Sequence, residues 1–340
     1  MDLLGFTIIV VKVLVVFAAT MLGVLVMIYA ERRVSAFMQD RVGPNRVGPK
    51  GVLQPIADGI KFLMKEDLVP ERVDKPIFIL APAILLIPAL MTFAVIPFGS
   101  SINLFGREIA LQVADVNVGI LYILALTSIS VYGIVLAGWS SNNKYSLLGG
   151  LRSSAQLISY ELAMGLAVVS IILLAGSLRL NDIITDQQGS FFSWNIFRQP
   201  LAFLIFLIAV YAETNRLPFD LSEAEQELVG GYHTEYSSMK FAMFFMAEYA
   251  NMITAAALTV TLFFGGWDVP LLDEASLGLF GALLSVLSFI LKMAFFLFLF
   301  IWVRWTFPRF RYDQLMRLGW KVMLPLALFN IFLTGGYLTI

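Results

Sequence analysis

Eight separate apolar stretches, each near 20 residues long, set the strongest limit on how this 340-residue chain folds. A helix needs about 20 apolar residues to cross the hydrocarbon core of a bilayer. The period-two alternation that marks an outer-membrane barrel is absent from the sequence. We therefore predict an all-α fold, a single membrane domain over residues 1–340, with transmembrane helices at about 6–30, 77–98, 118–139, 155–177, 200–216, 241–265, 281–304 and 320–339.

Lysine and arginine are distributed unevenly between the connections of these spans. The first, third, fifth and seventh connections hold 18 of them, and the second, fourth and sixth hold 3. Because cytoplasmic loops carry the excess of positive charge, both termini are expected on the outer, periplasmic side of a bacterial inner membrane. The apolar N-terminus lacks a basic segment before its hydrophobic run, so it is expected to be a retained span and not a cleaved signal.

The first connection contains an amphipathic segment at about residues 50–66, which follows a Gly- and Pro-rich turn at residues 43–49. One face carries the apolar residues Leu53, Ile56, Ala57, Ile60, Leu63 and Met64. A segment this short and charged cannot span a bilayer, so it is expected to lie in the cytoplasmic interface. Packing on a partner protein is an equally good interpretation, and the two are compatible.

A second connection, at about residues 213–240, is unusually acidic. Six carboxylates fall within residues 210–236, namely Glu213, Asp220, Glu223, Glu225, Glu227 and Glu235, a quarter of the chain's 24 acids. They face one arginine, Arg216, and the only histidine, His233. Carboxylates crowded in a low dielectric raise one another's pKa and titrate together. By itself this pattern fits a proton channel, a cation transporter or a docking surface for a basic partner.

Ionisable residues inside or at the ends of the spans are candidates for function, because burying a charge costs several kcal/mol. Glu31 closes the first span, and Glu161 and Glu248 each lie about two turns into a span. Glu161 has no charged neighbour three or four residues away, so no local ion pair explains it. Lys292 lies in the middle of its span and is expected to pair with a carboxylate or water.

The sequence also limits redox chemistry in this chain. Zero cysteines exclude disulfides, thiolate metal sites and an iron–sulfur cluster ligated by this polypeptide. One histidine excludes a multi-histidine metal site or a bis-histidine haem. No metal site and no cofactor are therefore predicted here.

Four long motifs resemble one family of membrane subunits in bacterial respiratory complex I, the NADH:quinone oxidoreductase. They are YAERRVSAFMQDRVGPNRVGPKGVLQPIADGIKFLMKED, LRSSAQLISYELAMGL, AETNRLPFDLSEAEQELVGGYHTEYSSMKFAMFFMAEYANM and WVRWTFPRFRYDQLMRLGWKVMLPLAL. The resemblance covers essentially the whole chain. It implies a component of an H⁺-translocating NADH:quinone reductase, a translocase. Its partners would be small membrane subunits, antiporter-like subunits and a peripheral arm that carries flavin and iron–sulfur clusters.

The resemblance also implies roles for particular residues, none of them catalytic, because electron transfer belongs to the partners. The implied quinone chamber comprises Glu31, Arg32, Gln39, Arg41, Arg46, Phe219, Asp220 and Glu223. The proton relay that would couple quinone reduction to proton translocation comprises Glu161, Glu213, Arg216, Glu225, Glu227 and Glu248, to which we add Lys292 for its mid-span position. Arg216, beside Glu213, is expected to hold the charge balance of the loop, or else to form a structural salt bridge.

Two alternatives remain at this point. One is the homologous membrane subunit of an energy-converting hydrogenase or a formate-linked complex, which uses no quinone. The other is an independent cation/proton antiporter, whose charges would centre on lysine and glutamate within broken helices. The intact QDRVGPNRVGPKG turn and the interfacial segment favour the quinone version.

Overall fold

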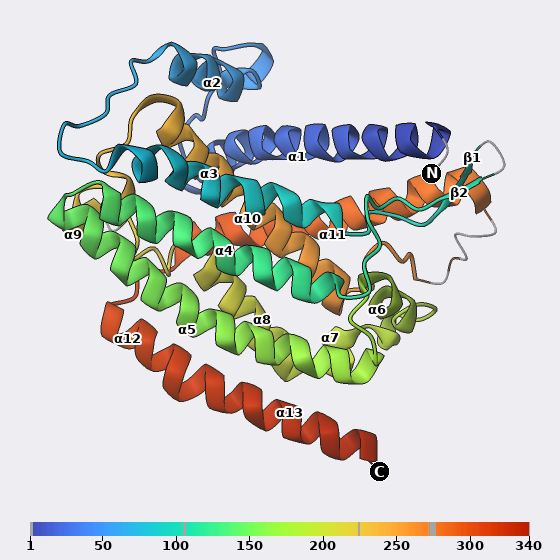
Figure 1. The fold of residues 1–340 in the computed structure, drawn as a ribbon. Coiled ribbons are helices and arrows are strands. Elements are labelled where there is room, and N and C mark those ends of the chain that lie inside the picture. The colour runs from blue at the N-terminus through green and yellow to red at the C-terminus, as the bar shows by residue number, and fades with distance from the viewer. Residues whose placement is uncertain (1–2, 105–106, 224, 271, 273–276, 340) are drawn as a thin grey trace.

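The computed structural model describes residues 3–104, 107–223, 225–270, 272 and 277–339, and shows a helical bundle (Figure 1). In the described chain, seven helices are long and apolar enough to cross a membrane: Leu4–Met38, Lys75–Ala94, Gly119–Ser140, Lys144–Ala175, Ser238–Phe263, Gly278–Thr306 and Tyr312–Thr339. The prediction of a helical, multi-pass membrane protein is therefore confirmed. The predicted fifth span, 200–216, is a shorter apolar helix, α8 (Pro200–Glu213), of 14 residues.

The long elements are α1 (Leu3–Met38), α3 (Lys75–Met91), α4 (Gly119–Ser140), α5 (Lys144–Ala175), α10 (Ser238–Phe263), α11 (Gly278–Thr306) and α13 (Leu324–Thr339). The short helices are α2 (Gln54–Met64), α6 (Leu180–Asp186), α7 (Asn195–Arg198), α9 (Glu225–Leu228) and α12 (Tyr312–Arg317). Single turns lie at η1 (Pro49–Gly51), η2 (Thr92–Ala94), η3 (Phe191–Ser193) and η4 (Gly231–His233), and η6 (Leu318–Met323) is a π-helical segment. The only strands in the described residues form an antiparallel hairpin, β1 (Ile102–Leu104) with β2 (Arg107–Ile109).

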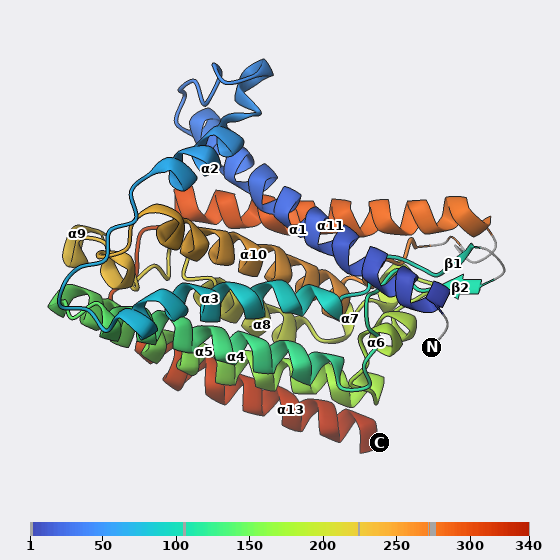
Figure 2. The same ribbon diagram turned by 45° about the horizontal axis from the view of Figure 1, so that its top comes forward.

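The long helices, taken in chain order together with α8 (Pro200–Glu213), run in alternating directions (Figure 1). The α2 and α9 segments lie at one end of the bundle, and the hairpin, α6 and both termini lie at the other (Figures 1 and 2). The basic and acidic connections are thus gathered at the α2 end. Helix α8 runs alongside α5 but, with only 14 residues, covers part of the distance between the two ends.

Helix α10 is the centre of the bundle. Every residue from Met252 to Phe263 is buried, and the helix packs against α1, α3, α8 and α11. Three consecutive alanines, Ala255–Ala257, let neighbouring helices approach closely, which is how helices associate in a membrane. In contrast, α1 leaves most of its apolar residues exposed, with Leu14 61% and Phe17 51% accessible.

Two boundaries differ from the sequence prediction. Helix α1 continues past Glu31 to Met38, because residues 32–38 contain no glycine or proline, so Glu31 lies within the helix and not at its end. Helix α2 is shorter than the predicted segment 50–66, because Lys50 and Gly51 adopt positive φ angles of 54° and 78°. Ile60, Leu63 and Met64 are exposed on α2, and their place at a membrane interface stays a prediction.

The contact between α5 and the η4 turn gives a stability prediction. A Cβ added at Gly149 would lie 2.7 Å from the backbone nitrogen of Tyr232, whereas one added at Gly165, on the same helix, meets nothing within 4 Å. We expect Gly149→Ala to displace η4 and to lower the thermal unfolding temperature of the purified protein. Gly165→Ala is the matched control and should be neutral or stabilising by about 1 kcal/mol. Equal unfolding temperatures for the two variants would contradict the packing described.

Candidate functional site

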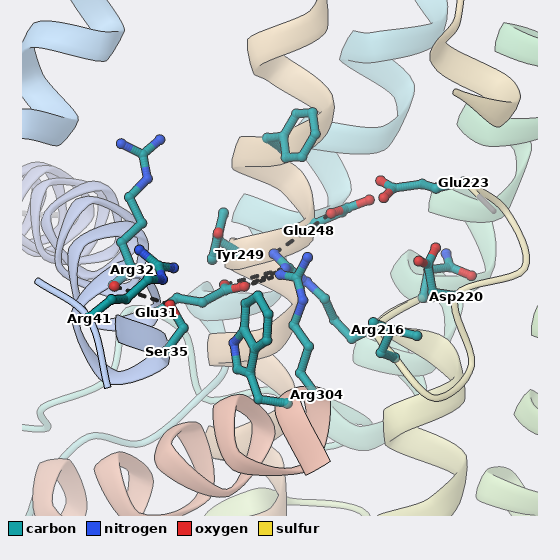
Figure 3. Close-up of a pocket in the computed structure, with 14 residues that line it drawn as sticks. Glu31, Arg32, Ser35, Arg41, Arg216, Asp220, Glu223, Glu248, Tyr249 and Arg304 are labelled. Atoms are coloured by element: carbon teal, nitrogen blue, oxygen red, sulfur yellow. Dashed lines mark hydrogen bonds and ion pairs between the residues drawn. The ribbon is translucent and has the colours of Figure 1, made fainter. Parts of the chain in front are cut away.

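A polar cavity of about 240 Å³ opens where α1, α10, α11 and the loop after α8 meet (Figure 3). Its lining residues come from these four segments and from the connection after α1: Glu31, Arg32 and Ser35; Arg41; Asn215, Arg216, Leu217, Asp220 and Glu223; Phe245, Glu248 and Tyr249; and Arg304 and Trp305. This collection of acids and arginines stands out in a chain that is only 14% charged.

The loop reaches the cavity because α8 ends early. Asn215 adopts a left-handed φ of 49°, which asparagine tolerates better than most residues, and Pro218 cannot continue a helix. The buried Gln156 amide donates hydrogen bonds to the carbonyls of Ala212 at 2.7 Å and Phe219 at 2.8 Å, which fixes the turn. A 14-residue helix is about 21 Å long, shorter than a hydrocarbon core of about 30 Å, and the residues that follow α8 fold into the bundle and do not extend the helix.

Arg216 is the central cation of the site. Its guanidinium lies 3.3 Å from Glu31 of α1 and 3.8 Å from Glu248 of α10, and its side chain is 7% exposed. It also lies over the ring of Tyr249, with 4.4 Å between the guanidinium carbon and the ring centroid. Arg304 of α11 forms a second ion pair with Glu31. Removing one partner of a buried ion pair leaves an uncompensated charge and costs about 3–5 kcal/mol, so the charged residues of this network are interdependent.

Two neighbouring acids of the loop have pKa values shifted in opposite directions. Burial, together with the charge of Glu223, raises the pKa of Asp220 to about 6, although Arg309 donates a hydrogen bond to it at 2.8 Å. Burial would also raise the pKa of Glu223, but His233, 3.4 Å away, and the charge of Arg216 outweigh it and lower that pKa to about 2. Glu223 therefore stays ionised near neutral pH, while Asp220 is poised to exchange a proton.

The structure brings together seven of the residues that the sequence singled out. Glu31, Arg32, Arg41, Arg216, Asp220, Glu223 and Glu248 all line the cavity. Gln39 and Arg46 are exposed and do not line it. Phe219 is buried beside the cavity, against the rings of Tyr160 and Phe310. The guanidinium of Arg216 points at Glu31 and Glu248, and its role in the charge balance of the loop stays a prediction.

The remaining relay candidates lie outside the cavity. Glu213 lines a small internal cavity with Thr127, Asn251 and Thr254, within electrostatic reach of Glu161. Glu161 accepts a hydrogen bond from Ser128 and lines an open, mainly apolar groove bordered by α4, α5 and α13. These two acids sit side by side away from the arginines of the cavity.

Glu227 and Lys292 do not line the cavity, and each interacts with residues elsewhere in the bundle. Glu227 is an exposed acid, 56% accessible, that pairs with Arg152 at 2.6 Å, and the side chain of Glu225 lies outside the described part of the structure. Lys292 lies at the opposite end of the bundle and donates to the carbonyls of Phe264, Gly266 and Asp268 at 2.7–3.0 Å. A cation at the C-terminus of α10 is favourable there, so Lys292 closes that helix.

Sequence reasoning missed several residues of the site. Arg304 and Arg309 entered the sequence analysis only in the count of Lys and Arg that sets the membrane orientation, because they lie at and after the end of a predicted span. Tyr232 donates a hydrogen bond to Glu248 at 3.2 Å, and His233 pairs with Glu223. The sequence signal that could have revealed His233 was its position, as the only histidine, within the most acidic segment of the chain. The assembled cavity can hold a polar group that accepts hydrogen bonds from arginine and exchanges protons with carboxyl groups.

Comparison with known proteins gives consistent results. A family model described as NADH dehydrogenase matches residues 11–335. A protein of Geobacter metallireducens, named as the second of its NADH-quinone oxidoreductase H subunits, is 57% identical over 337 residues, covering 96% of this chain and 94% of its own. The first such H subunit of Geobacter sulfurreducens is 57% identical and covers 95% and 93%. The first one of Cytophaga hutchinsonii is 52% identical, with 91% and 90% covered.

The ion pairs of Arg216 give a charge-compensation prediction. Arg216→Gln leaves Glu31 and Glu248 facing each other with one cation fewer, and we expect it to cost about 3–5 kcal/mol of stability. Adding Glu31→Gln to that variant removes the excess negative charge and should recover part of the loss. Thermal unfolding of both variants and of Glu31→Gln alone measures the coupling. Losses that simply add in the double variant would show that the pair does not interact.

Proposed function

The chain belongs to the NADH dehydrogenase family, and we propose that it is the membrane subunit of a proton-pumping NADH:quinone oxidoreductase that forms one wall of the quinone chamber. The names of its relatives support the complex and the substrate. The observation that carries the proposal is the cavity of about 240 Å³, whose polar lining contacts the buried Glu31–Arg216–Glu248 network. Binding there would act directly on charges held between α1, α10 and the acidic loop.

The cavity fits a chamber that a second polypeptide completes. Ligand sites usually enclose about 300–1,000 Å³, and this cavity is both smaller and partly open. Arg32 and Arg41 lie at one side of it and offer N–H donors to a quinone oxygen (Figure 3). The chain carries no cysteine to ligate an iron–sulfur cluster, and in the proposed complex the flavin and the clusters that supply electrons would belong to peripheral-arm partners.

Coupling follows from the position of the carboxyl groups. A quinone that receives two electrons takes up two protons, and Asp220, with a pKa raised by burial to about 6, can supply one near neutral pH. Loss of that proton adds negative charge beside Glu223 and Arg309, which biases how the loop is held. Because the loop begins at Glu213, the same shift reaches the Glu213–Glu161 pair, which would pass it toward small membrane and antiporter-like partners.

We also propose eight membrane crossings, with both termini on the periplasmic side of a bacterial inner membrane. In this topology α8 is the fifth crossing and α2 lies in the cytoplasmic interface. Support comes from the alternating directions of the helices and from the 18 to 3 distribution of Lys and Arg. Helix α8 can cross despite its length because neighbouring helices bury it and the loop that follows is held within the bundle.

Isolation of the complex tests the assembly. A tag on this chain, extraction in mild detergent and mass spectrometry should yield NADH-oxidising flavin and iron–sulfur subunits together with antiporter-like subunits. A nickel–iron hydrogenase or formate dehydrogenase partner would remove the quinone from the proposal. A chain that is isolated alone and still transports protons or sodium would overturn it.

Glu213→Gln tests the coupling role. The amide keeps the size of the side chain and removes its proton exchange, so NADH oxidation with quinone should fall while oxidation with an artificial acceptor is unchanged. Asp186→Asn is the control, because that acid pairs with Arg198 at the opposite end of the bundle. Loss of both activities would indicate failed assembly, and full quinone activity would contradict the role assigned to Glu213.

A further inference from the structure

The cavity has an exposed edge as well as a buried inner side. On the inner side, the side chains of Glu31 and Arg216 are 8% and 7% exposed. The lining residues Arg32, Arg41 and Trp305 are exposed, and the side chain of Arg32 is 47% accessible. We call the edge that these three residues form the mouth of the cavity. A ligand reaches the inner charges through this mouth.

The side chain of Arg32 at the mouth is held by helix α2. Its guanidinium lies 2.5 Å from one carboxylate oxygen of Asp58, and the other oxygen accepts a hydrogen bond from the Gln54 amide at 3.0 Å. The guanidinium is therefore directed toward α2 and away from Arg216 (Figure 3). No residue of α2 is among the described residues that line the cavity, so Asp58 acts on the cavity through Arg32.

The C-terminal end of α2 is attached to the first turn of α10. The Ser238 hydroxyl lies 2.9 Å from the carbonyl oxygen of Phe62 and 2.8 Å from that of Lys65. Just beyond the helix, Lys240 pairs with Asp67 at 2.8 Å. The last carbonyls of a helix have no partner within the helix, so the serine satisfies groups that α2 itself leaves open. These contacts fix this end of α2 to α10.

The other end of α2 is held to α1 by polar contacts of a weaker kind. They are the Arg32–Asp58 pair and a hydrogen bond of 2.9 Å from the Tyr29 hydroxyl to the Lys50 carbonyl, and both are solvent-exposed. Exposed ion pairs contribute little to stability, because water screens them and two long side chains have to be ordered. The end of α2 beside α1 is therefore the one that can be released while the other stays attached.

We propose that Asp58 is a positioning residue that holds Arg32 at the mouth, and that release of this pair lets the adjoining end of α2 move away from α1 so that a quinone enters or leaves. This inference rests on the proposed function. The C-terminal end of α2 stays on α10 during the movement. A quinone passes the same step in both directions, so the pair controls the rates of entry and release and not the affinity.

Three substitutions separate this role from a general effect on α2. Asp58→Asn keeps the size of the side chain and an acceptor for Gln54, but removes the charge that holds Arg32. Asp58→Glu restores the charge and is the conservative rescue. Asp67→Asn is the matched control, because it breaks an ion pair at the other end of α2, where Ser238 still binds two carbonyls. Arg32 stays in every variant, so its N–H donors remain at the cavity.

Rapid mixing of the whole complex with a short-tailed quinone measures the two rates. Quinone quenches tryptophan fluorescence, and the part of the signal that is lost in Trp305→Phe reports arrival in the cavity. Dilution of the loaded complex gives the rate of release. Asp58→Asn should raise both rate constants about threefold, as expected for the loss of an exposed ion pair, and leave the Kd unchanged. Asp58→Glu and Asp67→Asn should match the wild type.

Each other outcome contradicts the proposal in its own way. Wild-type rates in Asp58→Asn would show that the pair does not limit passage. A changed Kd would show that Asp58 acts on the bound quinone and not on its passage. Equal acceleration in Asp67→Asn would show that any loosening of α2 is enough. If the wild-type complex oxidises NADH with an artificial acceptor but shows no quenching by quinone, the proposed function itself fails.

Discussion

A buried guanidinium between two carboxylates from different helices holds together the end of the bundle at which α2 lies. Glu31 of α1 and Glu248 of α10 share Arg216, and Arg304 of α11 adds a second cation to Glu31. Helix α1 buries few of its apolar residues in the bundle, so these ion pairs add to the packing of Met27 and Ala36 in holding this end of it. In a low dielectric such an arrangement is stable only while its charges balance, which makes it sensitive to any ligand that adds or removes one.

Because α8 is short, the charged residues that follow it lie inside the bundle, at the cavity. A full-length span would carry Glu213 and Arg216 to the membrane surface, where water screens them. Instead the helix ends at Glu213, and Gln156 folds the next residues back into the bundle through the carbonyls of Ala212 and Phe219. The acidic loop is therefore held inside by side-chain contacts from α5 and from the connection after α11, including the Arg309–Asp220 pair.

Residue patterns predict most of the helices, because a bilayer demands long apolar segments and this chain has them. They also identify Glu31, Glu161 and Glu248, because isolated charges in apolar sequence have few explanations. Arg304, Arg309 and Gln156 could not be recognised, since their partners lie 273, 89 and 56 or more residues away. Lys292 was assigned to the relay because its partners could not be recognised either. They are backbone carbonyls 24–28 residues earlier in the chain, and the fold brings the C-terminal end of α10 beside the lysine.

The two halves of α10 are held with different firmness, which decides which segment a change of charge in the cavity would displace. Lys292 closes the C-terminal end with three carbonyl contacts, and every residue from Met252 to Phe263 is buried, so this half of the helix has little freedom. Its N-terminal half carries Glu248 and faces a loop held by individual polar contacts. In the proposed coupling, loss of protons from the cavity would therefore displace the loop, which is the more weakly held partner. The loop would move against α10, and its first residue, Glu213, would carry that motion to Glu161.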